Sequence, residues 1–235
     1  MTKTILITGA SSGIGAFTAK LFLSRGWNVG LIARREDKLA IIADNHRNSL
    51  CIKCDVCQEN QVIDAFQLMV DHFGAVDVLF NNAGIFTPQA RIDQIDINDW
   101  QKSIDVNLTG MFLAAREAFR HMTKNGGRII NNGSISAHTP REGSAPYTTT
   151  KHAITGLTKT IALDGRDLNI CCGQIDIGNA HTEMVAKLSH ANGVVETMAV
   201  SDAAEAVWNM AQLPLSTNIL TMTIMANKMP FVGRG

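Results

Sequence analysis

A serine, a tyrosine and a lysine lie in one short segment at spacings that suit proton transfer. Ser134 precedes Tyr147 by thirteen residues, and Lys151 follows this tyrosine, the only one in the chain, by four. Apolar side chains recur at helical spacing after Tyr147, so Tyr147 and Lys151 are predicted to share one helix face. An ammonium near a phenol stabilises the phenolate and eases proton exchange. Ser134 is then expected to hold the substrate oxygen.

The amino-terminal segment TILITGASSGIGAF has the order of a dinucleotide-binding unit. A short apolar strand precedes a glycine-rich turn, and a helical pattern starts near Ile14. Gly9 permits a tight turn, Gly13 lets the backbone approach a pyrophosphate, and Gly15 allows close packing of helix on strand. The helix N-terminus offers unpaired N–H groups to anionic oxygens. Because strand and helix patterns flank the turn, a dinucleotide site is favoured over the ordinary βα turn of a flavodoxin-like fold.

Together these segments resemble the short-chain dehydrogenase/reductase family in its compact single-domain form, and the resemblance runs nearly from end to end. Four of the family's motifs occur in the family's order, which makes the resemblance specific. The matching positions are Thr8–Gly15 for TGxxxGxG, Asn81–Gly84 for NNAG, Asn107 for the helix asparagine, and Ser134, Tyr147 and Lys151 for the catalytic set.

The resemblance implies hydride transfer between a nicotinamide and a carbonyl or alcohol, coupled to proton transfer. In the reductive direction Tyr147 protonates the developing alkoxide and Ser134 hydrogen-bonds the same oxygen. Lys151 lowers the proton affinity of the phenol and binds the nicotinamide ribose. Asn107 resembles the asparagine that holds a relay water, and its alternative is a polar residue that distorts a helix. Ser136 lies nearby, but its spacing to Tyr147 is shorter than the family's.

Further cofactor contacts follow from the resemblance. Thr182 matches the threonine beside the nicotinamide carboxamide, although Ile177-Gly178 stands where Pro-Gly is usual, which leaves the path of that loop open. For Asn81, a structural role that ties strands together is favoured over direct contact. The predicted cofactor-binding residues are Gly9, Ser11, Ser12, Gly13, Ile14, Gly15, Arg34, Arg35, Asp55, Val56, Asn82, Ala83, Gly84, Tyr147, Lys151, Gly178, Ala180 and Thr182.

Two arginines bear on the identity of the cofactor. Arg34 and Arg35 follow the last apolar residue of the second predicted strand, where the adenine ribose is expected. An acidic residue there would bind a ribose 2′-hydroxyl, whereas an arginine favours a 2′-phosphate through a planar, charge-assisted fork. The alternative is that both arginines only solvate the start of a helix. Arg34 therefore predicts NADP(H) in preference to NAD(H).

Short apolar runs alternate with longer helical patterns, which is typical of a parallel sheet covered by helices on both faces. The predicted fold is a three-layer, doubly wound α/β (Rossmann) fold, with residues 1–235 forming one dinucleotide-binding and catalytic domain. Ligands of such folds bind at the carboxyl ends of the strands. The seven predicted strands are Thr4–Thr8, Asn28–Ala33, Leu50–Asp55, Val76–Asn81, Arg128–Asn132, Asn169–Gln174 and Asn218–Ile224.

Composition points to small-molecule chemistry. The chain has 235 residues, 46% of them hydrophobic, and its formal net charge is +0. No charge excess favours nucleic acid or an acidic membrane. The apolar run before Thr8 is too short for a signal peptide, and no later run reaches transmembrane length. A cytoplasmic enzyme with a small carbonyl or alcohol substrate is therefore expected.

Five cysteines raise the question of a metal site. Cys51, Cys54 and Cys57 lie three residues apart, but Cys51 and Cys54 have opposite parity on a predicted strand and should point to opposite faces. Cys171 and Cys172 are neighbours on another strand-like run and should also point apart. No metal is therefore predicted, and the odd number of cysteines fits a reducing compartment.

Several features do not name a ligand. His138 and His152 flank the catalytic segment without an obvious acid partner; His138 is expected to line the pocket and His152 to pack beside its helix.

The apolar final strand and the MPFVG segment after it predict a homotetramer or homodimer, as the resemblance implies. The segment after Thr182 occupies the family's variable substrate loop and is mixed in polarity.

Two other functional classes stay open from the sequence. One is a nonenzymatic NADP(H)-binding sensor, which would have no use for an intact serine, tyrosine and lysine set. The other is an isomerase that uses the nicotinamide transiently, and the related enzymes of that kind usually have a longer carboxyl-terminal region. The intact set and the chain length favour the reductase.

Overall fold

Seven parallel strands form one sheet in the computed structural model, which describes residues 2–183, 185–186 and 196–231. Their spatial order is β3-β2-β1-β4-β5-β6-β7, with the crossover between β1 and β4 that is typical of a doubly wound sheet. Every neighbouring pair is parallel. The strands are β1 (Thr4–Thr8), β2 (Asn28–Ala33), β3 (Ser49–Lys53), β4 (Val78–Asn81), β5 (Gly127–Asn132), β6 (Ile170–Ile177) and β7 (Thr221–Ile224).

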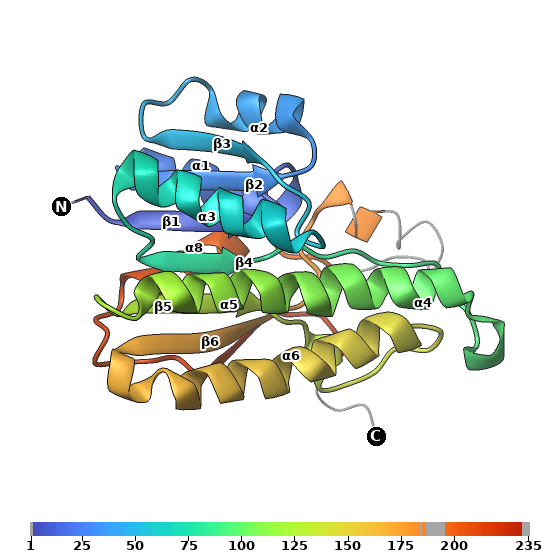
Figure 1. Cartoon of the computed structure of the whole chain (residues 1–235). Helices are drawn as coiled ribbons and strands as arrows, with labels where there is room; N and C mark the ends of the chain where they lie inside the picture. The colour runs from blue at the N-terminus through green and yellow to red at the C-terminus, as the bar shows by residue number, and fades with distance from the viewer. Residues whose placement is uncertain (1, 184, 187–195, 232–235) are drawn as a thin grey trace.

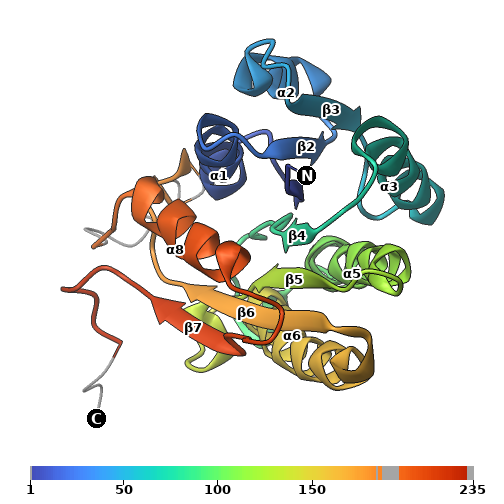
Figure 2. The same cartoon turned by 90° about the vertical axis from the view of Figure 1, so that its left-hand side faces the viewer.

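Helices cover both faces of this sheet (Figures 1 and 2). Helices α1 (Gly13–Ser24), α2 (Glu36–Ala43) and α8 (Val200–Gln212) pack on one face, and α3 (Glu59–Phe73), α5 (Gly110–Met122) and α6 (Ala145–Asp164) pack on the other. Helix α4 (Ile97–Ile104) runs into α5 through a π-helical turn at Asp105–Thr109. Short 3-10 turns lie at Ile92–Gln94, Ile135–Ala137 and Arg166–Leu168.

The core is divided by the sheet into two apolar clusters. Ile5, Ile7 and Phe22 belong to the cluster under α1 and α8, whereas Leu6 and Phe66 belong to the cluster under α3 and α5. This division follows from the alternation of side chains along a strand, because successive residues point to opposite faces. Within the described residues, no helix combines the length and apolar character needed to cross a membrane.

All seven predicted strands occur, and the predicted doubly wound fold is confirmed, but several strand ends differ. Strand β3 stops at Lys53, before the predicted end at Asp55, because Asp55 enters a turn in which its carboxylate accepts from Cys57 N at 3.1 Å. Strand β6 continues to Ile177, beyond the predicted end at Gln174. It includes the buried Asp176, whose carboxylate is fully hydrogen-bonded inside the fold.

The strands end together at one rim, on the side of Figure 1 towards which their arrows point. Because all seven strands are parallel, the residues that follow their carboxyl ends are brought close to one another. The glycine turn follows β1, the arginine pair follows β2, the NNAG motif spans the end of β4, and Ser134 follows β5. The rim is therefore where the candidate site is assembled.

Candidate active site

The glycine turn between β1 and α1 has the backbone that its three glycines permit. Gly9 and Gly13 adopt φ of 67° and 55°, a left-handed region that other residues rarely adopt. A Cβ on Gly15 would lie 2.5 Å from the Gly9 carbonyl oxygen, so only glycine fits there. Helix α1 begins at Gly13, and the Ser12 side chain makes no capping hydrogen bond to it. The first N–H groups of α1 can therefore face an anion, which fits a pyrophosphate.

Asparagines at the ends of β4 and β5 fasten this turn to the sheet. Thr8 Oγ accepts hydrogen bonds from the N–H groups of Asn82 and Ala83 at 2.9 and 3.0 Å. The Asn82 amide donates to the Thr8 carbonyl at 3.0 Å and accepts from Asn132 Nδ2 at 2.9 Å. Asn81 donates to Asn131 Oδ1 of β5 at 3.2 Å and accepts from Thr8 Oγ1 of β1 at 3.4 Å, contacts that fit the strand-tying role favoured for it. Asn82 and Ala83 therefore lie against the glycine turn.

Arg35 makes a contact with the glycine turn that the sequence alone does not reveal. Its guanidinium donates to Ser11 Oγ at 2.9 Å and to Ser12 Oγ at 3.2 Å. Arg34 instead lines a separate pocket of about 350 Å³. That pocket also contains Asp55, and its other lining residues are Cys57, Asn98, Gln101, Lys102, Asp105 and Val106. The two arginines thus border neighbouring parts of the rim, and Lys102 adds a further cation that sequence reasoning missed.

Contacts with neighbouring side chains and backbone fix the positions of the other predicted cofactor residues near β3, β4 and α1. Val56 is buried and contacts Gly110, where any added Cβ would lie 2.8 Å from Val56 Cγ2. Ile14 is half-buried in the first turn of α1 and packs on the core cluster beneath that helix. Gly84 approaches Asn107, whose Oδ1 would lie 3.4 Å from a Cβ at this position.

Ser134, Tyr147 and Lys151 are brought together at the rim by β5 and α6. Helix α6 begins at Ala145 with a proline in its first turn, a position where the missing N–H costs nothing. Tyr147 and Lys151 are one turn apart, with Lys151 Nζ 5.5 Å from the centre of the Tyr147 ring. Lys151 is buried and donates to the Asn132 carbonyl at 2.6 Å. Phe86 packs against the Tyr147 ring at a centroid distance of 4.2 Å.

Burial sets the protonation of the tyrosine and lysine. It raises the pKa of Tyr147, and the Ser134 side chain and the Arg141 charge oppose that rise. Burial also lowers the pKa of Lys151 to about 8, against the opposing charge of Asp176. The sequence predicts that Lys151 lowers the proton affinity of Tyr147. In the structure the lysine ammonium donates to the Asn132 carbonyl. The pKa of Lys151 is lowered, whereas that of Tyr147 is raised.

Asn107 lies in the π-helical turn between α4 and α5 and is fully buried. Its Oδ1 accepts from the Ile85 N–H at 2.8 Å, and its Nδ2 donates to the Ile85 carbonyl at 3.0 Å and to Ser103 Oγ at 3.2 Å. A longer contact of 3.5 Å reaches Thr150 Oγ1 on α6. The side chain therefore joins the backbone after the NNAG motif to the helix that carries Tyr147.

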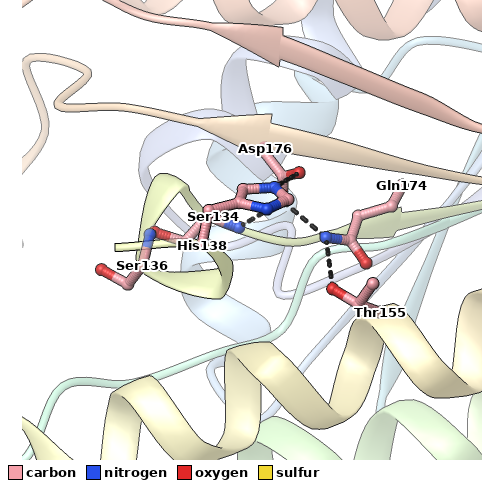
Figure 3. Close-up of polar contacts among 6 residues, drawn as sticks. All are labelled: Ser134, Ser136, His138, Thr155, Gln174 and Asp176. Atoms are coloured by element: carbon pink, nitrogen blue, oxygen red, sulfur yellow. Dashed lines mark hydrogen bonds and ion pairs between the residues drawn. The ribbon is translucent and has the colours of Figure 1, made fainter. Parts of the chain in front are cut away.

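The carboxylate of Asp176 is a central group that the sequence analysis missed. It is fully buried and accepts from the Ser134 N–H at 2.9 Å, from Gln174 Nε2 at 2.6 Å and from His138 Nε2 at 2.8 Å (Figure 3). The expectation that His138 lacks an acid partner is thus wrong. His152 is exposed and contacts the Thr148 carbonyl of its own helix, as expected. The signal was present in β6, where Gln174 and Asp176 put two polar side chains on one face of an apolar strand.

The residues after β6 differ in whether they lie near the glycine turn. Thr182 lies against the glycine turn, where its Cγ2 would be 3.3 Å from a Cβ on Gly13. Ala180 is buried and pairs with Met198. Gly178 instead donates to the Ile224 carbonyl at 2.8 Å and packs against Met225, so its contacts are with the end of β7. Most of the predicted substrate loop after Thr182 and the last residues of MPFVG lie outside the described residues.

The cysteines are packing residues. Cys51 packs with one core cluster and Cys54 with the other, so their side chains point to opposite faces of the sheet as predicted. Burial raises the pKa of Cys54 to about 12 and that of Cys57 to about 11, which disfavours the thiolate that binds metals. Over residues 2–183, 185–186 and 196–231 no group of three or more histidine, cysteine or acidic side chains could hold a metal ion.

Comparison with known proteins gives concordant matches. The family model described as short chain dehydrogenase matches residues 3–193. Glucose 1-dehydrogenase 2 of Bacillus subtilis (strain 168) is 34% identical over 188 residues, which are 77% of this chain and 73% of that protein.

Two solved structures match over nearly the whole fold. A 3-ketoacyl-(acyl-carrier-protein) reductase from Brucella melitensis, complexed with NADH, has a TM-score of 0.88 at 25% identity and covers 96% of this chain and 97% of its own. The closed form of a serine dehydrogenase complexed with NADP+ has a TM-score of 0.88 at 26% identity and covers 99% of this chain and 98% of its own.

Proposed function

Because the chain belongs to the short-chain dehydrogenase family, we propose that it is an NADP(H)-dependent oxidoreductase that interconverts a carbonyl and an alcohol on a small molecule. The observation that carries the proposal is the meeting of two structures at one rim. A glycine turn shaped for a pyrophosphate follows β1, and Ser134, Tyr147 and Lys151 come together beyond β5. A nicotinamide, when bound, supplies or accepts the hydride.

The protein's own side chains handle the proton. Tyr147 acts as the general acid in reduction and as the general base in oxidation. Ser134 donates to the reacting oxygen, and its backbone is fixed by Asp176, so its hydroxyl starts from a defined position. Lys151, anchored by Asn132, favours the tyrosinate once the proton has left. Lys151 also binds the nicotinamide ribose.

Asn107 is proposed to support proton exchange with solvent. Its position between the NNAG backbone and α6 supports this, because its contact with Thr150 lies one residue from Lys151. The π-helical turn supports the structural alternative equally, since such turns place a side chain out of ordinary helical register. Both roles are compatible with one buried asparagine.

Preference for NADP(H) over NAD(H) rests on the two arginines. Arg35 lies over the hydroxyls of Ser11 and Ser12, and Arg34 borders the pocket that contains Asp55. A 2′-phosphate at the end of β2 would find the Arg35 guanidinium beside the two serine hydroxyls, with the Arg34 guanidinium in the neighbouring pocket. The relatives divide on this point, because one solved structure contains NADH and the other NADP+.

The remaining cofactor assignments are proposals of the same kind. We assign Gly9, Gly13, Ile14 and Gly15 to the pyrophosphate, and Asp55 and Val56 to the adenine. Asn82, Ala83 and Gly84 pass beside the adenosine ribose. Ala180 and Thr182 serve the nicotinamide, supported by the contact of Thr182 with the glycine turn. The assignment of Gly178 to the cofactor site has the least support, because this residue contacts Met225 and β7.

A homotetramer or homodimer is proposed as the working assembly. The support is the position of β7 at the edge of the sheet, where β6 is its one partner among the described strands. Light scattering at working concentration tests the proposal, and a monomeric mass would contradict it.

The proposed activity is tested by NADPH consumption against a panel of ketones, aldehydes and 3-oxoacyl thioesters, with NADH in parallel. Tyr147→Phe serves as the matched variant, since it removes only the hydroxyl. Loss of at least ~10²-fold in turnover with NADPH binding retained is expected. Tight NADPH binding without turnover in either protein would favour the nonenzymatic sensor.

A further inference from the structure

Two side-chain contacts tie the segment 138–141 to the end of β6, beside the proposed active site. His138 Nε2 lies 2.8 Å from Asp176 Oδ2, and Arg141 Nη2 donates to Asn179 Oδ1 at 2.8 Å. Both basic residues come from the loop between Ser134 and Tyr147, and both of their partners come from the strand end that precedes Thr182.

The imidazole of His138 is held in place yet remains accessible. Its partner Asp176 is wholly buried and also accepts from Ser134 and Gln174, so the carboxylate itself cannot turn away (Figure 3). The side chain of His138 keeps 42% of its surface exposed. Because Nε2 is occupied by Asp176, the edge of the ring that carries Nδ1 is the one left for a ligand.

Among the described residues, the side chain of Arg141 makes one hydrogen bond, which leaves most of its donors without a partner there. It is half-buried, and its contact with Asn179 occupies one of five N–H donors with a neutral amide. In the described part of the chain no carboxylate lies within ion-pairing distance of it. Its charge nevertheless acts on the Tyr147 hydroxyl, where it opposes the effect of burial. Among the described residues Arg141 is therefore a cation without a carboxylate partner, and it lies within electrostatic reach of the Tyr147 hydroxyl.

We propose that Arg141 and His138 form a carboxylate-binding subsite, so that the substrate is a hydroxy or oxo compound that also carries a carboxylate. This rests on the proposed oxidoreductase function and names its substrate class. A planar guanidinium matches the two oxygens of a carboxylate, and a His138 ring that carries a proton on both nitrogens would add a second donor beside it. A phosphate group is disfavoured, because a single guanidinium supplies too little charge to balance a dianion.

Binding of unreactive probes to the NADP⁺-loaded protein tests this subsite without knowledge of the true substrate. Cyclohexanecarboxylate and cyclohexanecarboxamide have nearly the same shape and differ in charge. Isothermal titration should show the carboxylate binding more tightly to the wild type. In Arg141→Met the carboxylate affinity should fall by about tenfold to a hundredfold, which is the loss expected for a charge-assisted pair, and the carboxamide affinity should change little.

Two further variants sharpen the result. Arg141→Lys keeps the charge without the planar fork and should lose an intermediate part of the preference. Arg166→Met removes an exposed arginine from the turn after α6 and should leave both affinities as in the wild type. Equal binding of the two probes by the wild type, no carboxylate binding at all, or an unchanged ratio in Arg141→Met would each overturn the inference.

The subsite and the proposed function fail in different ways. A protein that reduces neutral ketones through Tyr147, with no carboxylate preference, keeps its proposed function and loses the subsite. A protein that binds the carboxylate through Arg141 but shows no Tyr147-dependent turnover keeps the subsite and loses the proposed reaction.

Discussion

The backbone N–H of Ser134 donates a hydrogen bond of 2.9 Å to the buried carboxylate of Asp176. This contact joins the segment after β5 to β6 and places a negative charge close to Tyr147 and Lys151. The charge raises the pKa of both Tyr147 and Lys151. One buried carboxylate therefore orients the serine and shifts the titration of the tyrosine and lysine in the same direction.

Asp176→Asn is expected to move the pH profile of turnover to lower pH. The substitution removes the charge but keeps an oxygen that can accept from Ser134. Since the charge of Asp176 raises the pKa values of Tyr147 and Lys151, its removal lowers both. The alkaline limb of log(kcat/KM) against pH reports this change. Asp202→Asn, at an exposed position on α8, is the matched control, and an unmoved limb in Asp176→Asn would contradict the assignment.

Carbonyl reduction should decline as the pH rises through the pKa of Lys151. Burial lowers that pKa to about 8, so the ammonium is complete below that pH and is lost above it. If the neutral amine is inactive, the rate falls by about tenfold for each further pH unit. Lys151→Arg keeps a charge that does not titrate in this range, so its residual activity should lack the limb. A limb retained in Lys151→Arg would assign it to another group.

Arg35→Met should weaken NADPH binding by about tenfold to a hundredfold, because it removes a charge-assisted pair with the 2′-phosphate. NADH affinity should change little, since NADH has no such phosphate. The Arg35 guanidinium donates to the hydroxyls of Ser11 and Ser12 at the glycine turn. Substitution of Arg35 is therefore the stronger test of a phosphate contact. Arg34→Met, tested alongside by fluorescence titration of both cofactors, separates the contributions of the two arginines. Equal losses for NADPH and NADH would contradict a phosphate contact.

Arg128→Met should lower the free energy of unfolding by about 2–4 kcal/mol, because it leaves buried acceptors without donors. The buried guanidinium donates to Asn218 Oδ1 at 3.1 Å and to three carbonyls at 2.8 to 3.4 Å, those of Leu213, Pro214 and Thr217. These contacts close the loop between α8 and β7, at the opposite end of β5 from Ser134. Urea unfolding measures the loss, with Arg166→Met as the exposed control; equal stability of the two variants would contradict it.

The fold could be predicted because its signals are local. Apolar runs marked all seven strands, and the glycine turn marked the start of α1 close to its observed position at Gly13. The strand ends were less predictable, since they depend on partners elsewhere. Asp176 stays inside β6 because Ser134, Gln174 and His138 satisfy its carboxylate, and none of these contacts is visible from β6 alone.

Site residues that belong to one sequence motif could be predicted. Contacts that depend on how neighbouring strands align could not. Tyr147 and Lys151 face each other because four residues make one helical turn. The pairing of His138 with Asp176, by contrast, requires β5 and β6 to align Asn132 with Ile175. Arg35 likewise reaches Ser11 only because β1 and β2 are neighbours. Such contacts join segments that no local pattern relates.

The asparagine and threonine contacts across the ends of β1, β4 and β5 have a mechanical consequence. Thr8, Asn82 and Asn132 are cross-linked in series, so sliding one strand along another would break several hydrogen bonds at once. The glycine turn and the Lys151 anchor therefore belong to a single stiff frame. We therefore expect the separation between the glycine turn and Lys151 Nζ to change little when a ligand binds.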